Sequence, residues 1–426
     1  MVKISNGDKI KILTNSEELE GIYLPSLNKD TFTIKLSSGY NIGINKNKIK
    51  EIKIIEKFKE KEELLPKLKY NQELKTISIL HTGGTISSSI SYETGGVISR
   101  FTPEEIISMF PELQKIANIK SRLISNMFSE DMNFNHYNIL AKEIEKEIKD
   151  GVDGVIITHG TDTLAITSAA LSFILEDINT PVILVGAQRS SDRGSTDAKL
   201  NLISAANFIA KTDFQDIAIC MHNSKNDDKC LIISPVRSRK FHSSSRDAFK
   251  LINEFPIAEI SFEGHVNFLK AHHKKENKSL KLKLINPKLK IGILKAHPNM
   301  IAKEVSNYSD FNALILEGYG LAGNFPINEI DKYTKENKKI YSEIKKLAKK
   351  IPLISTSQTI YGRINMNVYS TGRLLQEAGV IGNYLDILTE TAFVKIAWLL
   401  SNYPKNKTKE LFHENLRGEI TKRTEE

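Results

Sequence analysis

Short apolar segments, each followed by a glycine turn and then a helical pattern, constrain the fold of this chain most strongly. From Thr76 onward, runs such as Ile77–Leu80, Gly154–Thr158 and Val182–Val185 alternate with apolar or amphipathic segments of helix length. Strands that alternate with helices usually pair in parallel, because the helix carries the chain back across one face of the sheet. The pattern predicts an α/β fold with parallel or mixed sheets and helices on both faces.

The first 57 residues have a different pattern. Five short segments rich in β-branched residues are separated by turn residues, at 8–13, 20–24, 31–36, 40–44 and 49–55. This spacing predicts a small all-β barrel domain. We therefore divide the chain into a β-barrel domain (1–57), a charged linker (58–75), a larger α/β domain with the catalytic residues (76–285), a smaller C-terminal α/β domain (286–402) and a polar tail with a loose end (403–426).

The composition favours a protein of the reducing cytoplasm. No apolar run approaches the length of a membrane span, and the N-terminus lacks the apolar core of a secretory signal. Cys220 and Cys230 are too few for a disulfide framework, so we expect a buried free pair. The formal net charge of +9 permits an RNA partner, but solubility explains it equally well.

The turn after the first α/β strand carries the first candidate for chemistry. Gly83 and Gly84 end the apolar run, and Thr85 follows them. Because glycine lacks a Cβ, the backbone can turn sharply there and a ligand can approach it closely. A hydroxyl at the carboxyl end of a buried strand lies where open α/β sheets place their active sites. Thr85 is therefore a candidate nucleophile. A plain glycine turn with solvated threonines is the alternative.

The loop after Gly154–Thr158 is built in the same way. Thr161 and Asp162 lie between a buried strand and a helix N-terminus, where the helix dipole favours negative charge. The alternative is that Asp162 or Thr163 simply caps the helix. Two threonine-bearing glycine loops after two buried strands favour a shared site over two separate caps.

A threonine nucleophile needs a base close to it. His81 and His159 each lie at a strand end beside a glycine, and we interpret both as packed or loop-orienting residues. A lysine paired with a carboxylate would serve instead. The residues alone offer too many lysines to choose one.

A third glycine motif matches a nucleotide-binding pattern but lacks the structural context of one. Gly318–Gly323 matches G-x-G-x-x-G, the pattern of dinucleotide-binding loops. Such a loop opens a helix at its third glycine, whereas Pro326 follows closely here. We interpret the segment as a tight turn at a strand end.

The two threonine loops resemble the signatures of a known family. His81–Ile86 and Thr158–Thr163 are similar to the two signature motifs of the bacterial-type L-asparaginases. The resemblance runs from about residue 77 to residue 398 and includes two further segments, Ser129–Met132 and Gly186–Arg189. It implies an asparaginase-like fold of two α/β domains.

The resemblance also implies roles for single residues. Thr85 would be the acylated nucleophile, and a second set of hydroxyl, acid and base would consist of Thr161, Asp162 and Lys240. Substrate binding would fall to Tyr92 on a mobile flap, Ser129, Glu130 and Ala187. Ser129 and Glu130 would bind the α-amino and α-carboxyl groups of a small amino acid. Many free asparaginases have glutamine where Glu130 stands, so the preference between glutamine and asparagine stays open. No metal ion is expected.

A finer resemblance concerns one branch of that family. The N-terminal barrel, Gln188–Arg193 and Ser244–Phe249 are similar to the D subunits of archaeal glutamyl-tRNA(Gln) amidotransferases. This implies a homodimeric, ammonia-generating amidase that hydrolyses glutamine or asparagine through a threonine acyl-enzyme. An E subunit would use the ammonia, with ATP and Mg²⁺, to convert Glu-tRNA(Gln) to Gln-tRNA(Gln). No cofactor or membrane is expected for this chain.

Two alternatives remain. The first is a stand-alone cytosolic L-asparaginase, and the N-terminal barrel speaks against it. The second is a non-catalytic amino-acid-binding scaffold. The presence together of Thr85, Thr161, Asp162 and Lys240 speaks against that interpretation.

Overall fold

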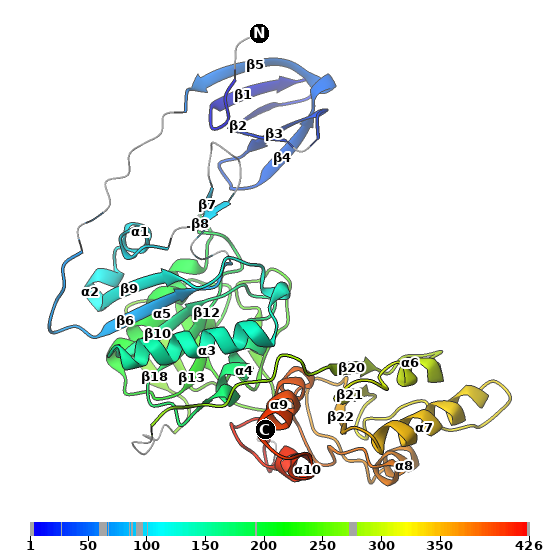
Figure 1. The fold of residues 1–426 in the computed structure, drawn as a ribbon. Helices are drawn as coiled ribbons and strands as arrows, with labels where there is room; N and C mark the ends of the chain where they lie inside the picture. Colours follow the sequence, from blue (N-terminus) through cyan, green and yellow to red (C-terminus); the bar gives the residue numbers. More distant parts are fainter. Residues whose placement is uncertain are drawn as a thin grey trace.

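The computed structural model describes residues 4–26, 28–58, 66, 68–84, 86, 88–90, 97–99, 101–191, 194–271 and 279–423. Three larger sheets follow one another along the chain, and helices flank the second and third (Figure 1). The predicted α/β fold with a β-rich N-terminal domain is confirmed.

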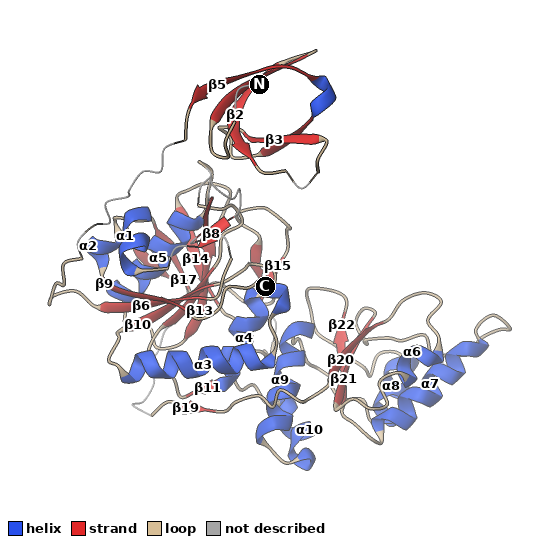
Figure 2. Cartoon of the chain, turned by 45° about the horizontal axis from the view of Figure 1, so that its top comes forward, coloured by secondary structure: helices blue, strands red, loops and turns tan. Residues whose placement is uncertain are grey.

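The N-terminal domain is a curved antiparallel sheet of five strands in the order β4-β3-β2-β1-β5 (Figure 2). The strands are β1 (Lys9–Thr14), β2 (Glu18–Leu24), β3 (Thr31–Lys35), β4 (Asn41–Asn45) and β5 (Ile49–Glu56). Its small core consists of Ile10, Ile12, Ile34 and Ile44. In β1 the buried isoleucines alternate with more exposed residues, as a half-buried strand requires. Within the described residues no pairing joins β4 to β5, so the barrel is open along that edge.

The second sheet has eight strands in the order β18-β17-β14-β13-β12-β10-β6-β9. Its strands are β6 (Thr76–His81), β9 (Asn118–Leu123), β10 (Gly154–Thr158), β12 (Val182–Val185), β13 (Ile217–His222), β14 (Lys229–Ile233), β17 (Ala258–Ser261) and β18 (Val266–Phe268). From β9 to β13 neighbouring strands are parallel, and the remaining three pairs are antiparallel. The sheet is therefore mixed, with its parallel part on the β9 side and its antiparallel part on the β18 side.

The register of this sheet decides where the loops begin. Thr158, the last residue of β10, is paired with His81 of β6 on one side and with Val185 of β12 on the other. The three strands therefore end at the same level. Parallel strands deliver their carboxyl ends to one edge of the sheet, so the loops that follow start side by side.

Helices cover both faces of the sheet, as expected. One face packs against α1 (Pro103–Met109), α2 (Leu113–Ile116) and α5 (Ala198–Lys211). The other packs against α3 (Phe134–Lys149) and α4 (Leu164–Ile174), and α9 (Thr389–Asn402) packs on α4. Nine of the eleven residues of α4 are buried, because this helix lies between the sheet and α9.

The third sheet is parallel and has the order β20-β21-β22. Its strands are β20 (Ile291–Lys295), β21 (Ala313–Gly318) and β22 (Leu353–Ser357). One face of this sheet packs against α6 (Ala302–Ser306), α7 (Lys335–Ala348) and α8 (Ser370–Ala378). The other face packs against α9, which also contacts α4 through the rings of Trp398 and Phe173, 5.5 Å apart. The second and third sheets therefore share one apolar core.

The glycine motif in this part is a turn, as predicted. Gly320 and Gly323 have φ values of 56° and 60°, and Tyr319 pairs with Asn324 across the turn. The next helix, α7, begins only at Lys335.

The remaining elements are short. They are β7 (Ser88–Ile90), β8 (Val97–Ser99), β11 (Leu175–Glu176), β15 (Ser238–Lys240), β16 (Phe249–Leu251), β19 (Lys281–Leu282), α10 (Lys405–His413) and two 3₁₀ turns, Lys46–Lys48 and Ser129–Asp131. Both cysteines are free and buried, as expected. In the part of the chain that the structure describes, no helix is both long and apolar enough to cross a membrane.

The polar C-terminal segment is folded over residues 403–423. This segment forms α10 and packs on α9, where it buries Phe412 completely. Lys395 of α9 is also completely buried, and its ammonium lies 2.5 Å from the Glu419 carboxylate and 2.9 Å from the Phe412 carbonyl. A buried ammonium needs such acceptors to offset its lost hydration. The polar composition of the segment therefore reflects internal pairing as well as contact with water.

We expect Glu419→Ala to lower the free energy of unfolding by about 3–5 kcal/mol, because it leaves Lys395 buried without its counter-ion. Urea unfolding would measure the change. Glu145→Ala removes an exposed i,i+4 pair with Lys149 and serves as the control, with an expected loss of about 0.5 kcal/mol. Similar losses for the two variants would contradict this account of the C-terminal segment.

Candidate active site

Two glycine loops touch at the carboxyl edge of the second sheet. A Cβ added to Gly84, in the loop after β6, would lie 2.9 Å from the backbone nitrogen of Gly160, in the loop after β10. Gly84 also has a φ of +86°, a conformation that side chains rarely allow. In the loop after β12, a Cβ on Gly186 would lie 2.7 Å from the methyl carbon of Thr161. Only glycine allows these backbones to come so close.

The segment after β9 closes a third side of the site. A Cβ on Gly160 would lie 2.8 Å from the Cβ of Ser129, and the Thr163 hydroxyl donates a 2.6 Å hydrogen bond to the Ser129 carbonyl. Ser129 is buried, whereas its neighbour Glu130 is exposed. Ala187, beside Gly186, is buried as well. Three of the predicted substrate-binding residues therefore lie on loops that meet at this edge.

Lys240 reaches the same place from a hairpin. It is the last residue of β15, and its ammonium lies 2.8 Å from the Thr161 hydroxyl and 2.9 Å from the Asp162 carboxylate. The Lys240 side chain is 14% exposed and that of Asp162 is 67% exposed. A hydroxyl and an acid from adjacent residues thus contact an amine that lies almost 80 residues further along the chain.

This geometry argues against the simpler interpretation of the second loop as a helix cap. Thr163 is the N-cap residue of α4, but its side chain makes no capping hydrogen bond. Its hydroxyl goes to Ser129 instead, and Asp162 pairs with Lys240. The polar side chains of this loop are aimed across the sheet edge and away from their own helix.

The two histidines at the strand ends are packed and neutral. The ring nitrogens of His81 lie 2.8 Å from the Thr158 hydroxyl and 2.9 Å from the Ser121 hydroxyl. Burial lowers the pKa of His81 to about 3. Burial also lowers the pKa of His159 to about 4, although a hydrogen bond to the Gly160 carbonyl opposes this. Neither ring carries a charge near neutral pH, in agreement with the interpretation of both as loop-orienting residues.

Two predicted residues, Thr85 and Tyr92, lie outside the described residues. The residues on either side of Thr85 are described: Gly84 contacts the second loop, and Ile86 is buried in the core between the sheet, α1 and α5. The roles assigned to Thr85 and Tyr92 stay predictions.

The residues that hold the loop after β12 were not predicted from the sequence. The backbone N–H groups of Gln188 and Arg189 each donate a 2.9 Å hydrogen bond to the buried carboxylate of Asp197. Asn201, one turn further along α5, donates a 2.9 Å hydrogen bond to the Gly186 carbonyl. Polar residues at the start of a helix that is rich in apolar residues are the signal that could have identified them.

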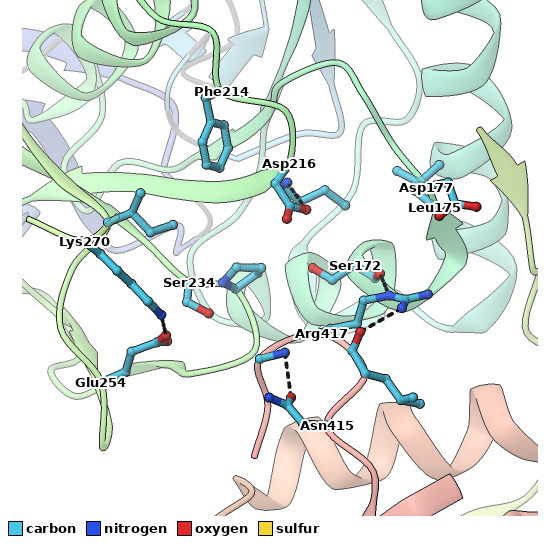
Figure 3. Close-up of a pocket in the computed structure, with 15 residues that line it drawn as sticks. Ser172, Leu175, Asp177, Phe214, Asp216, Ser234, Glu254, Lys270, Asn415 and Arg417 are labelled. Atoms are coloured by element: carbon cyan, nitrogen blue, oxygen red, sulfur yellow. Dashed lines mark hydrogen bonds and ion pairs between the residues drawn. The ribbon is translucent and has the colours of Figure 1, made fainter. Parts of the chain in front are cut away.

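A separate cavity of about 390 Å³ lies near the amino end of β13, away from this edge of the sheet (Figure 3). Its charged groups are already paired with protein groups. Arg417 donates a 2.7 Å hydrogen bond to the Ser172 carbonyl, and Lys270 forms an ion pair with Glu254. We therefore place the candidate active site at the Lys240 group and not in this cavity.

Comparison with known proteins matches each of the three parts of the chain to a protein family. Three family models match, described as "Asparaginase, N-terminal" over residues 76–274, "Glutaminase/Asparaginase C-terminal domain" over residues 290–412 and "GatD N-terminal domain" over residues 4–55. The D subunit of glutamyl-tRNA(Gln) amidotransferase from Methanococcus maripaludis is 42% identical over 424 residues, which cover 97% of each chain. The protein of the same name from Pyrococcus furiosus is 42% identical over 432 residues, 99% of this chain and 93% of its own.

This chain belongs to the family of glutamyl-tRNA(Gln) amidotransferase D subunits.

The asparaginase part of this family member also has solved structural neighbours. The thermostable L-asparaginase from Thermococcus kodakarensis superposes with a TM-score of 0.70 at 28% identity, and the match covers 81% of this chain and 99% of that protein. L-asparaginase I from Vibrio cholerae gives a TM-score of 0.69 at 27% identity, covering 82% of this chain and 99% of that protein. The fold of an asparaginase is therefore contained in a longer chain.

We expect Gly84→Ala to lower the catalytic rate by at least about 100-fold, because its methyl group would push the two loops apart and misplace the reacting groups. Steady-state kinetics of ammonia release would measure the loss. Gly151→Ala is a matched control, since Gly151 has a similar φ of +81° but nothing within 4 Å of an added Cβ. That control should lose only about 1 kcal/mol of stability and keep its rate. Equal rates for the two variants would show that the loop contact does not matter.

Proposed function

We propose that this chain is the ammonia-generating amidase subunit of a tRNA-dependent amidotransferase that converts Glu-tRNA(Gln) to Gln-tRNA(Gln). The contact of Lys240 with both Thr161 and Asp162 is the observation that carries the proposal. An amine in contact with a hydroxyl and a carboxylate can accept, hold and return a proton during acyl transfer. The near full-length similarity to amidotransferase D subunits supports the biological setting.

The proposed reaction hydrolyses the side-chain amide of glutamine or asparagine through a threonine acyl-enzyme. The Thr85 hydroxyl attacks the amide carbon, the C–N bond breaks and ammonia leaves with a proton. Water then attacks the ester and releases glutamate or aspartate. Thr161, Lys240 and Asp162 form the set that moves protons in both halves, with Lys240 acting as base in its neutral form and Asp162 stabilising its protonated form.

Substrate binding would use the loops beside this set. Ser129 and Glu130 would bind the α-amino and α-carboxyl groups, with Asp162 helping at the amine. Ala187 would line the pocket from the loop after β12, and Tyr92 would close it as part of a flap. The proximity of Ser129 to Gly160 supports this arrangement, because Gly160 directly precedes Thr161, which contacts Lys240.

The partners in this proposal follow the family. The chain forms a homodimer and associates with an E subunit, which binds ATP and Mg²⁺ and presents the charged tRNA(Gln) in the cytoplasm. No cofactor is assigned to this chain, since threonine acyl transfer with a lysine base requires none.

A stand-alone L-asparaginase is the second candidate. The superposition with asparaginases over 81% of the chain favours it. The five-stranded N-terminal domain argues for a complex instead, because such a domain is an additional surface outside the asparaginase fold.

We expect the purified chain to release ammonia from glutamine or asparagine slowly by itself, and at least about tenfold faster with the E subunit, ATP and Glu-tRNA(Gln). Ammonia release and Gln-tRNA(Gln) formation would be measured together. Full turnover by the isolated chain that the partner and tRNA leave unchanged would favour the stand-alone asparaginase. No turnover in either setting would favour the scaffold.

We expect Thr161→Val and Lys240→Met to lower kcat by about 10²–10⁴-fold, because each removes one member of the proton-transfer set. Thr161→Ser keeps the hydroxyl and should retain most of the activity. Circular dichroism would establish that all three variants are folded. If Thr161→Val remained as active as Thr161→Ser, the hydroxyl would have no chemical role.

A further inference from the structure

A chain of polar contacts connects two loops of the candidate site through a buried histidine. His222, the last residue of β13, has a completely buried side chain. Its Nδ1 lies 2.6 Å from the Asn201 side-chain oxygen, and its Nε2 lies 3.1 Å from the Asp227 carboxylate. Asp227 in turn forms an ion pair with Arg246.

The two ends of this chain of contacts are attached to two different loops of the site. At one end, Asn201 donates its hydrogen bond to the Gly186 carbonyl, and Gly186 lies against Thr161. At the other end, Arg246 belongs to the turn of the β15–β16 hairpin, whose first strand ends in Lys240. His222 therefore links the loop beside Thr161 to the hairpin that carries Lys240.

Hydrogen-bond demand determines which ring nitrogens carry protons. The Asn201 amide nitrogen must face the Gly186 carbonyl, because a carbonyl oxygen can only accept a hydrogen bond. The Asn201 oxygen then faces His222 Nδ1, so Nδ1 must donate a hydrogen bond to it. On the other side of the ring, an ionised Asp227 carboxylate is also only an acceptor, so Nε2 must donate too. Both nitrogens carry a proton only in the imidazolium form.

The surroundings of the ring agree with a positive charge. Burial lowers the pKa of His222, but hydrogen bonds with Cys230 and the Asp227 carboxylate, together with the charges of Cys230 and Asp197, outweigh it and raise this pKa above its ordinary value. Cys220 and Arg246 are the other titratable or charged groups on this side; Cys220 contacts Cys230, and Arg246 contacts Asp227. The Asp227 side chain is 62% exposed, so protons can reach the buried ring through it.

We propose that His222 is a positioning residue for the amidase reaction, which as an imidazolium bridges Asp227 and Asn201 and so holds the Gly186–Arg189 loop against Thr161. This inference rests on the proposed function for its kinetic consequence. Loss of either ring proton would set a nitrogen lone pair against an oxygen lone pair, at Asn201 or at Asp227. The ring would then move and release Asn201 from the Gly186 carbonyl. Activity is therefore present below the raised pKa of His222 and declines as the pH rises through it.

The test is the alkaline limb of the pH profile of kcat/KM in the complex of the full chain with its partner subunit. Asp227→Asn removes a carboxylate that stabilises the imidazolium, so we expect the limb to move down by about one pH unit. Arg246→Gln removes a competing cation and should move the limb up. His222→Gln should lower kcat/KM about tenfold and lose this limb. A purely structural role would change yield or stability without opposite shifts of the limb.

Glu304→Gln is the matched control, because Glu304 forms a surface ion pair with His297 at 2.7 Å that also raises a histidine pKa. It should leave the profile unchanged. An alkaline limb that stays in place in Asp227→Asn would overturn the proposal.

Nuclear magnetic resonance of ring-labelled histidine in the full chain provides a readout that needs no activity, with His222→Gln to assign the signal. We expect both ring nitrogens of His222 to be protonated at neutral pH, and the amide signals of Gln188 and Arg189 to follow the titration. A singly protonated ring from pH 6 to pH 9 would refute the proposal even if amidase activity were high. If the ring were doubly protonated but the chain had no amidase activity, the proposed function would be wrong and the inference about the charge of His222 would stand.

Discussion

Contact between the backbones of glycine loops is the constraint on which the candidate site depends. Three parallel strands end at one level, so the loops after them begin side by side. Gly84 lies against Gly160 and Gly186 lies against Thr161, at distances that no Cβ would allow. This close approach leaves Thr161 and Asp162 within reach of Lys240. Preorganisation of this kind removes much of the cost of aligning reacting groups.

The scaffold beneath the site is held by apolar packing and by buried ion pairs. α9 lies between the second and third sheets and contributes to one core shared by both. Arg237 and Asp386, both completely buried, join the second sheet region to the segment before α9 at 3.2 Å. Lys395 and Glu419 join α9 to the C-terminal segment in the same way. Such pairs contribute little net stability, but the loss of one partner is costly, so they favour a single arrangement of these elements.

Three histidines at strand ends of the second sheet have opposite electrostatic roles. His81 and His159 are surrounded by hydroxyl groups, carbonyl groups and apolar side chains, and burial keeps both neutral. His222 is equally buried but faces a carboxylate and an amide oxygen, which favour the imidazolium. Burial alone therefore does not decide the charge of a histidine; the acceptors around the ring do.

The sequence by itself determined the local elements. Gly154–Thr158 and Val182–Val185 were predicted with the same bounds as β10 and β12, because continuous apolar runs of this length specify buried strands. The same pattern did not identify the folded C-terminal segment, whose charged residues pair internally. Nor did it identify Asn201, His222 or, without a family resemblance, Lys240 as the partner of Thr161. Only the tertiary structure decided these contacts, because they join residues far apart in the chain, and a local pattern carries no information about which distant side chain the fold brings into contact.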